Sequence, residues 1–139
     1  MATITANITL NSDITNHTIS ESMTMRKLGT TTGLDNSTGI ALKKFTSTAA
    51  VVVVEQDEVT DSKASKVYMR NSGSSKEDFF YVAINASAAA AATTETIGRL
   101  YGGDWMLIPW EANGTGHNIV AAPSTADEVT TIEYMTFHE

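Results

Sequence analysis

Residues 97–111, IGRLYGGDWMLIPWE, decide the expected fold of this chain. They contain both of its tryptophans, and a Gly-Gly pair stands at their centre. Glycine reaches positive φ without a Cβ clash, so Gly102-Gly103 predicts a tight turn. The apolar residues after the turn predict a buried strand, in which Trp105 or Trp110 anchors the core. Pro109 has no N–H group to donate and is expected to end the ladder pairing of that strand.

The N-terminal residues show the clearest alternation of apolar and polar side chains. Within residues 2–10 one face consists of Ile4, Ala6, Ile8 and Leu10. A period of two predicts a half-buried strand, and residues 14–25 repeat the pattern more weakly as a second strand. Residues 1–12 are therefore interpreted as an extended N-terminal strand or arm. Residues 26–38, RKLGTTTGLDNST, predict a long loop. This loop is either a partner-binding arm or a connection without a binding role.

The middle of the chain contains strands that are apolar on both faces. Residues 40–54 hold two strand candidates, and the second ends in four consecutive valines that need cover on both sides. Residues 66–71 predict another strand, and residues 78–85, DFFYVAIN, predict its partner. In that partner strand Phe79 and Tyr81 lie on one face, and the opposite face is also apolar. This pattern indicates either a central strand of a sandwich or an oligomer interface on the second face.

The last third completes an all-β pattern. Residues 86–92, ASAAAAA, are too few for an independent helix and predict a short helical turn or an ordered loop. Residues 117–121 and 129–137 predict two further strands. Short strands without βαβ alternation disfavour a parallel sheet. We therefore predict a single domain, residues 1–139, folded as an antiparallel β-sandwich with little helix. A jelly roll is the leading arrangement of its strands, and a small closed barrel is the alternative.

Composition excludes several classes of function. The formal net charge is −7 and the sequence pI is about 4.8, which argues against nucleic acid and anionic membranes as partners. The chain has no cysteine, so neither disulfides nor thiolate metal sites are expected. Residues 1–13 lack the basic start and apolar core of a signal peptide, so synthesis and assembly in a cytoplasm are expected.

The residue patterns do not predict an enzyme, a metal site or a cofactor. His17, His117 and His138 have no metal-ligand spacing. Asp104 and Glu111 flank the tryptophan-containing strand, but spacing across a strand does not establish an acid–base pair. The chain also lacks the serine-nucleophile and phosphate-loop motifs. The expectation is a non-enzymatic protein.

The second half of the chain resembles small structural proteins of tailed bacteriophages. The resemblance covers residues 66–139, in the segments KVYMRNSG, FFYVAIN, RLYGGDWMLIPWE, NIVAAPS and TTIEYMTF. The matching positions are Asn71-Ser72-Gly73, Leu100 with Gly103-Asp104, Pro109-Trp110, and Glu133-Tyr134. These are packing motifs, so they specify a fold better than a function.

This resemblance implies a virion protein of the capsid decoration or cement type. Such a protein is made in the host cytoplasm, lies on the capsid surface, and bridges subunits of the major capsid protein. Its β-sandwich subunits are expected to form a symmetric homo-oligomer, specifically a trimer. The candidate interface residues are Ile4, Ile8, Leu34, Phe79, Tyr81, Tyr101 and Trp110. The alternative is a tail or fibre adsorption module that uses Trp110 or Tyr101 to bind a host glycan.

Overall fold

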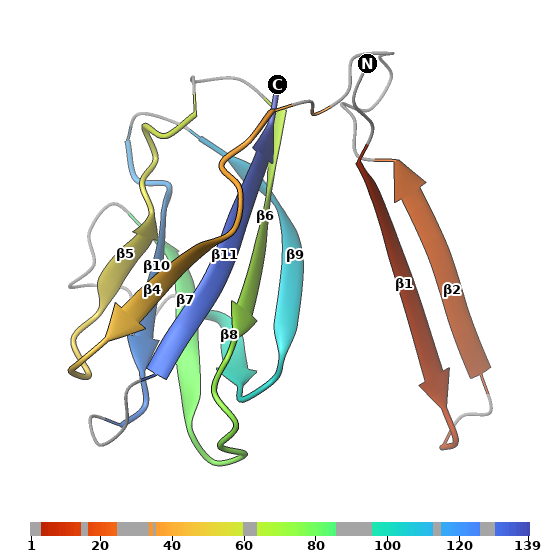
Figure 1. Cartoon of the computed structure of the whole chain (residues 1–139), viewed down its shortest axis with the longest axis horizontal. Helices are drawn as coiled ribbons and strands as arrows, with labels where there is room; N and C mark the ends of the chain where they lie inside the picture. The colour runs from red at the N-terminus through yellow and green to blue at the C-terminus, as the bar shows by residue number, and fades with distance from the viewer. Residues whose placement is uncertain are drawn as a thin grey trace.

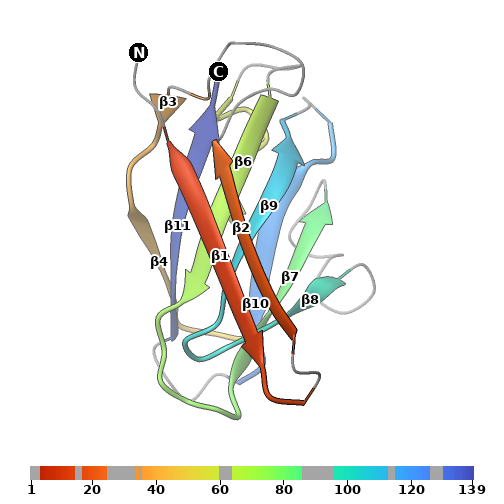
Figure 2. The same cartoon turned by 90° about the vertical axis from the view of Figure 1, so that its right-hand side faces the viewer.

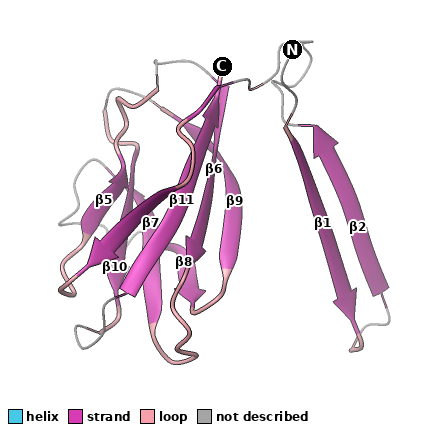
Figure 3. Ribbon diagram, viewed as in Figure 1, coloured by secondary structure: helices cyan, strands magenta, loops and turns pink. Residues whose placement is uncertain are grey.

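The computed structural model describes residues 4–14, 17–24, 34, 36–59, 64–85, 96–112, 115–125 and 130–139. The regular elements in these ranges are all β-strands (Figure 3), which confirms the predicted all-β class. The alanine-rich residues 86–92 and most of the predicted loop 26–38 lie outside the described residues. From that loop the structure describes Leu34 and residues 36–38.

Two antiparallel sheets form the body of the protein (Figure 1). One, here called the β7 sheet, has the order β5 (Val51–Val54), β10 (Asn118–Pro123), β7 (Phe79–Asn85) and β8 (Thr96–Tyr101). In the other, the β6 sheet, β11 (Thr130–His138) pairs with β3 (Asn36–Ser37), β4 (Ala41–Phe45) and β6 (Ala64–Asn71), and β6 pairs with β9 (Trp105–Glu111). Their inner faces share one core, so the predicted β-sandwich is confirmed.

The core is built from alternate residues of both sheets. Phe80 of β7 packs against Phe45 of β4 with their ring centroids 4.8 Å apart. Other core side chains are Val67, Met69, Val82, Leu100, Ile119 and Ile132. Val53 and Val54 are both buried. Both belong to the core between the sheets, whereas Val52 packs against Ala83 and Val120 on the other face, so the valine run has contacts on both sides, as predicted.

The strand after the Gly-Gly turn is not a buried strand, contrary to the prediction. In the part of the chain that the structure describes, strand β9 is an edge strand that pairs with β6 alone, and its pairing continues through Pro109 to Glu111. Proline is tolerated there because an edge strand bonds to a neighbour on one side only. Trp110 is 5% exposed and belongs to the core, whereas Trp105 is 51% exposed. The turn itself is confirmed, since Gly103 has a φ of 88°.

The N-terminal residues form a hairpin outside the sandwich. Among the described residues, strands β1 (Thr5–Ser12) and β2 (His17–Thr24) pair with each other and with no other strand, as a two-stranded antiparallel sheet. Figures 1 and 2 show the hairpin beside the sandwich, in front of the outer face of the β6 sheet. The predicted N-terminal strand therefore exists, and it is half of an arm-like hairpin.

Candidate interaction surfaces

The hairpin has one apolar and one polar face. Residues paired directly across antiparallel strands share a face, so the register assigns each side chain to a face. The apolar face carries Ala6, Ile8, Leu10, Ile19 and Met23, with Glu21 opposite Ile8. The polar face carries Thr5, Asn7, Thr9, Asn11, Thr18, Ser20 and Ser22. This division is typical of a sheet that covers another surface with one side.

The apolar face of the hairpin is turned toward the sandwich but is not covered by it. Ala6 and Ile8 are half-buried, whereas the adjacent polar residues Thr5, Asn7 and Thr9 are exposed. Leu10 remains 56% exposed, Ile19 42% and Met23 43%. A two-stranded hairpin is at best marginally stable alone in water. This face therefore needs further apolar contacts to hold the hairpin in place.

The sandwich offers a matching surface on the outer side of the β6 sheet. Val67 and Met69 of β6 point into the core, so Tyr68 points outward between them. Tyr68 pairs with Met135 on one side and with Leu107 on the other, which makes an apolar row across three strands. The outer apolar face, as we call this surface, consists of Leu42, Tyr68, Trp105, Leu107, Met135 and Phe137.

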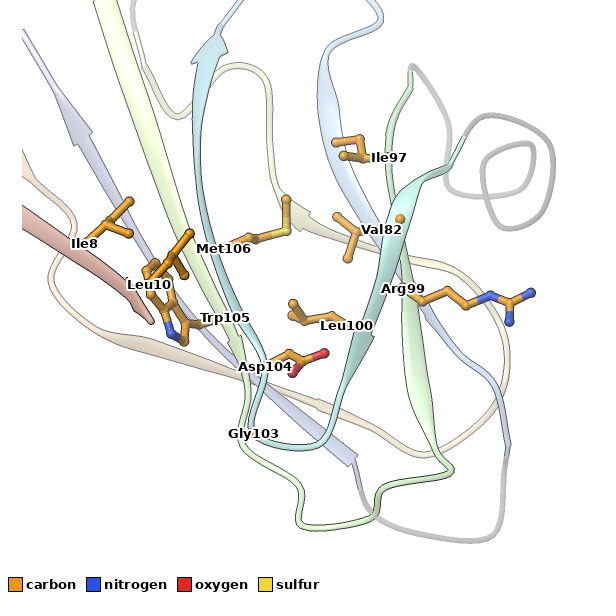
Figure 4. Close-up of a pocket in the computed structure, with 11 residues that line it drawn as sticks. Ile8, Leu10, Val82, Ile97, Arg99, Leu100, Gly103, Asp104, Trp105 and Met106 are labelled. Atoms are coloured by element: carbon orange, nitrogen blue, oxygen red, sulfur yellow. The ribbon is translucent and has the colours of Figure 1, made fainter. Parts of the chain in front are cut away.

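A cavity of about 560 Å³ lies where the hairpin meets the open edge between β8 and β9. Ile8 and Leu10 line it from the hairpin, and Leu100, Trp105 and Met106 line it from the sandwich (Figure 4). The cavity wall also includes Val82, Ile97 and Asp104, whereas the guanidinium of Arg99 points away from it. The edge of the sandwich is therefore an apolar hollow beside the outer apolar face.

Three of the predicted interface residues gather on the outer side of the β7 sheet. The ring centroid of Phe79 lies 4.9 Å from that of Tyr81 and 5.1 Å from that of Tyr101. The guanidinium carbon of Arg99 lies 4.7 Å from the Phe79 centroid, a cation–π geometry. A side-chain hydrogen bond to Tyr101 raises the pKa of Arg99 above its ordinary value. Arg99 therefore covers these rings as a permanent cation.

The remaining predicted interface residues divide between the hairpin and the core. Ile4 and Ile8 are half-buried at the hairpin. Leu34 is 1% exposed and Trp110 is 5% exposed, so predicting these two as surface contacts was wrong. The Trp110 indole N–H donates to the carbonyl oxygen of His117 at 2.7 Å, which fixes it inside the subunit. Trp110 therefore cannot stack on a glycan.

Asp104 and His117, two of the residues singled out in the sequence, have structural partners. Asp104 Oδ2 accepts a hydrogen bond of 3.0 Å from the backbone N–H of Tyr101, which stabilises the Gly-Gly turn. His117 Nδ1 lies 3.0 Å from the carbonyl oxygen of Glu111. Within the described residues, no group of three His, Asp or Glu side chains could hold a metal ion. The helices needed to cross a membrane are likewise not found among the described residues.

The sequence contains a signal for the outer apolar face in strands β9 and β11. Strand β11 carries Met135 and Phe137 on the face opposite its core residues. Strand β9 likewise carries Leu107 on the face opposite Met106. Apolar residues on both faces of neighbouring strands indicate a surface that something else covers.

Comparison with known protein families, curated proteins and solved structures gave no match for this chain.

Proposed function

We propose that this protein is a structural component of a phage virion, a capsid decoration or cement protein that stabilises the head by bridging coat subunits. Its partners in this role are the major capsid protein and further copies of itself, arranged as a trimer on the capsid surface. The observation that carries the proposal is the amphipathic hairpin, whose apolar face stays exposed beside a stable sandwich. An arm of this kind is suited to reach a neighbouring subunit.

The strand order supports the same class of protein. If β4 to β11 are numbered one to eight, the β6 sheet has the order 1-8-3-6 and the β7 sheet has the order 2-7-4-5. We interpret this arrangement as a jelly roll, in which two Greek keys interlock. Jelly rolls are common in viral capsid proteins, although a fold supports a function only by analogy.

In the proposed mechanism the protein binds the assembled shell and not the separate coat subunits. A protein that contacts two coat subunits at once buries surface that separate coat subunits do not offer together. Binding to only one state stabilises that state, by about 2.7 kcal/mol per site when the free protein is at 100 times its Kd. Many such sites across a shell would resist internal pressure and heating.

The alternative function is a tail or fibre module that binds a host glycan. The observation in its favour is the exposed Trp105, which lines a hollow of about 330 Å³ together with Tyr68 and Arg70. Aromatic rings beside a cation are suited to stacking and hydrogen bonding with a sugar. Quenching or shift of the Trp105 fluorescence by host polysaccharide would favour this alternative.

Quantitative mass spectrometry of purified virions tests the proposal. A fixed, near-stoichiometric ratio to the coat protein is the expected result. A copy number far below that of the coat protein would favour a vertex, neck or tail position, and with it the adsorption alternative. Absence from the particle would overturn both. In addition, heads stripped of the protein should release their DNA at a lower temperature, and adding the purified protein back should restore the original temperature.

A further inference from the structure

We propose that the hairpin of one copy covers the outer apolar face of the β6 sheet in a second copy. The donor surface is the apolar face of β1 and β2, and the acceptor surface includes Trp105 and the cavity mouth between β8 and β9. This inference rests on the self-association within the proposed function and does not depend on the virion location.

Both surfaces are apolar, and both stay partly exposed to water in a single chain. In the single subunit the hairpin already faces the β6 sheet (Figure 2), but Leu10 and Trp105 both remain more than half exposed. Ile8 and Leu10 form one wall of the cavity and do not fill it. Two apolar sheet faces pack with interdigitating side chains at a separation of about 10 Å. A closer approach of the same faces would therefore bury side chains that are now open.

The chain has enough length for the hairpin to reach a neighbour. The root of the arm is fixed, because Leu34 is buried and β3 pairs with β11. The Thr38 hydroxyl also accepts a hydrogen bond of 3.1 Å from the backbone N–H of Thr136. Ten Cα steps from Thr24 to Leu34 can span at most roughly 33–36 Å. That span is more than twice the radius of gyration of a 100-residue domain, which is about 13 Å. The hairpin can therefore reach beyond its own sandwich to a neighbouring copy.

Charge favours the same pairing, although the whole chain is strongly acidic. Residues 4–24 contain Asp13 and Glu21 and no lysine or arginine. The outer side of the β6 sheet carries three basic residues, Lys44, Lys66 and Arg70, against two acidic ones, Glu111 and Glu133. Glu21 lies on the apolar face itself, where a carboxylate needs a cation when it leaves water. Arg70, paired with Trp105 across the sheet, is suited to that role.

A donor and an acceptor surface on the same chain allow a closed ring. Each copy would give its hairpin to the next copy and receive one from the previous copy. Such a head-to-tail contact generates a ring if the rotation closes, and a trimer is one closed solution. Exchange of an arm between identical subunits needs no new surface, because each copy supplies both halves of the contact.

Thiol cross-linking between chains tests the proposal directly. The chain has no cysteine of its own, so introduced thiols report without background. Tagged Leu10→Cys protein is mixed with untagged Trp105→Cys protein and treated with a short bis-maleimide. A product joining one tagged and one untagged chain is expected. Thr9→Cys, which lies on the polar face of the hairpin, is the matched control and should give at least tenfold less of that product.

The double variant Leu10→Cys/Trp105→Cys distinguishes exchange from contact within one chain. Cross-linked chains of twice the mass or more are expected when both thiols are on each chain. A product of single-chain mass, with no joined chains in the mixture, would show that each hairpin docks on its own sandwich. That result would overturn the proposal, as would the absence of any cross-link.

Sedimentation equilibrium of the full chain supplies a second measurement. The Leu10→Asn/Ile19→Asn variant should dissociate at concentrations at least tenfold above those of the parent, with an unchanged unfolding temperature of the sandwich. The Thr9→Asn/Ser20→Asn variant changes the polar face only and should associate like the parent. A monomeric parent would overturn this inference, even if virions contain many copies and the coat is the partner. An oligomer absent from virions would instead overturn the proposed function alone.

Discussion

The Asn71 side chain donates a hydrogen bond of 3.0 Å from its Nδ2 atom to the carbonyl oxygen of Leu100. Asn71 ends β6 and Leu100 lies in β8, so this contact joins the two sheets. The Asn71 Oδ1 atom accepts from the Gly73 N–H at 2.9 Å, and its carbonyl oxygen accepts from the Gly103 N–H at 3.0 Å. Residues from separate segments of the chain therefore meet at one corner of the sandwich.

Asn71→Ala should lower the free energy of unfolding by about 2–4 kcal/mol, because it leaves two backbone groups at a buried corner without their partner. Urea denaturation followed by circular dichroism measures the change. Asn71→Asp keeps the acceptor for the Gly73 N–H but places a carboxylate beside the Leu100 carbonyl. This variant should therefore be no more stable than Asn71→Ala. Ser72→Ala is the control, since its Oγ is exposed and donates to Thr131, and it should cost about 1 kcal/mol or less. Equal losses for Asn71→Ala and Ser72→Ala would contradict the structural role of this corner.

Local patterns predicted the strands and the turn because these depend on neighbouring residues. The alternation in residues 2–10 and the glycines before Asp104 each act over a few positions. The position of a strand within its sheet depends instead on pairings between distant segments. For this reason the sequence did not distinguish Trp105 on an exposed edge from Trp110 in the core, although both lie in β9.

The candidate site was predicted only in part for the same reason. Alternation marks one face of a strand, so it placed Ile4 and Ile8 on the apolar face of the hairpin. The outer apolar face combines residues from β4, β6, β9 and β11, which no local pattern brings together. Leu34 was placed on a loop surface because its neighbours are polar, yet its side chain is buried. Burial of one apolar residue in a polar segment depends on contacts with distant parts of the chain, which no local pattern contains.

The two glycines of β8 and its turn should respond differently to the same substitution. A Cβ on Gly102 would overlap the carbonyl oxygen of Ser75, whereas a Cβ on Gly98 would meet nothing within 4 Å. Gly102→Ala is expected to destabilise the protein by about 3 kcal/mol or more, because backbone atoms must move. Gly98→Ala should stay within about 0.5 kcal/mol of the parent. Thermal unfolding of the two variants side by side checks this, and a tolerated Gly102→Ala would contradict the described turn.

Gly103→Ala tests the backbone conformation of the turn separately. Gly103 has a φ of 88° and free space around its Cα, so the substitution brings strain without a clash. An L-residue with positive φ costs about 1–2 kcal/mol. The loss of stability should therefore fall between those of Gly98→Ala and Gly102→Ala. Replacement by asparagine, which tolerates this region better, should recover part of the loss.

The two tryptophans should give opposite spectroscopic signals. In Trp105→Phe protein the remaining Trp110 is buried, so its emission should lie at short wavelength and resist quenching by iodide. In monomeric Trp110→Phe protein, where no neighbouring hairpin covers it, the exposed Trp105 should emit at longer wavelength and be quenched readily. Trp110→Phe also removes the hydrogen bond to the His117 carbonyl and should cost about 1–3 kcal/mol, whereas Trp105→Phe should cost little. Equal quenching of both variants would contradict the assigned positions.

Alkaline pH should destabilise the fold through Tyr134 and Tyr68. Burial raises the pKa of Tyr134 above 10.0, with a further contribution from the charge of Glu58. Burial, and then the nearby Glu133, raises the pKa of Tyr68 in the same direction. At pH values around and above 10 the folded protein therefore holds more protons than the unfolded chain. Stability must then fall as pH rises, by up to about 1.4 kcal/mol per pH unit for each differing proton.

The stabilising effect of these two phenols is complete below their unfolded pKa, so it should show no pH dependence between about pH 7 and 8.5. Urea unfolding at intervals from about pH 8 to 11 measures the slope. Tyr134→Phe cannot ionise at this position, so its stability should decline less steeply than that of the parent. Glu133→Gln is the matched test for Tyr68, because removing the charge should lower the pKa of that phenol and reduce the slope. Parallel curves for the parent and Tyr134→Phe would show that the Tyr134 hydroxyl ionises as readily in the folded protein as in the unfolded chain.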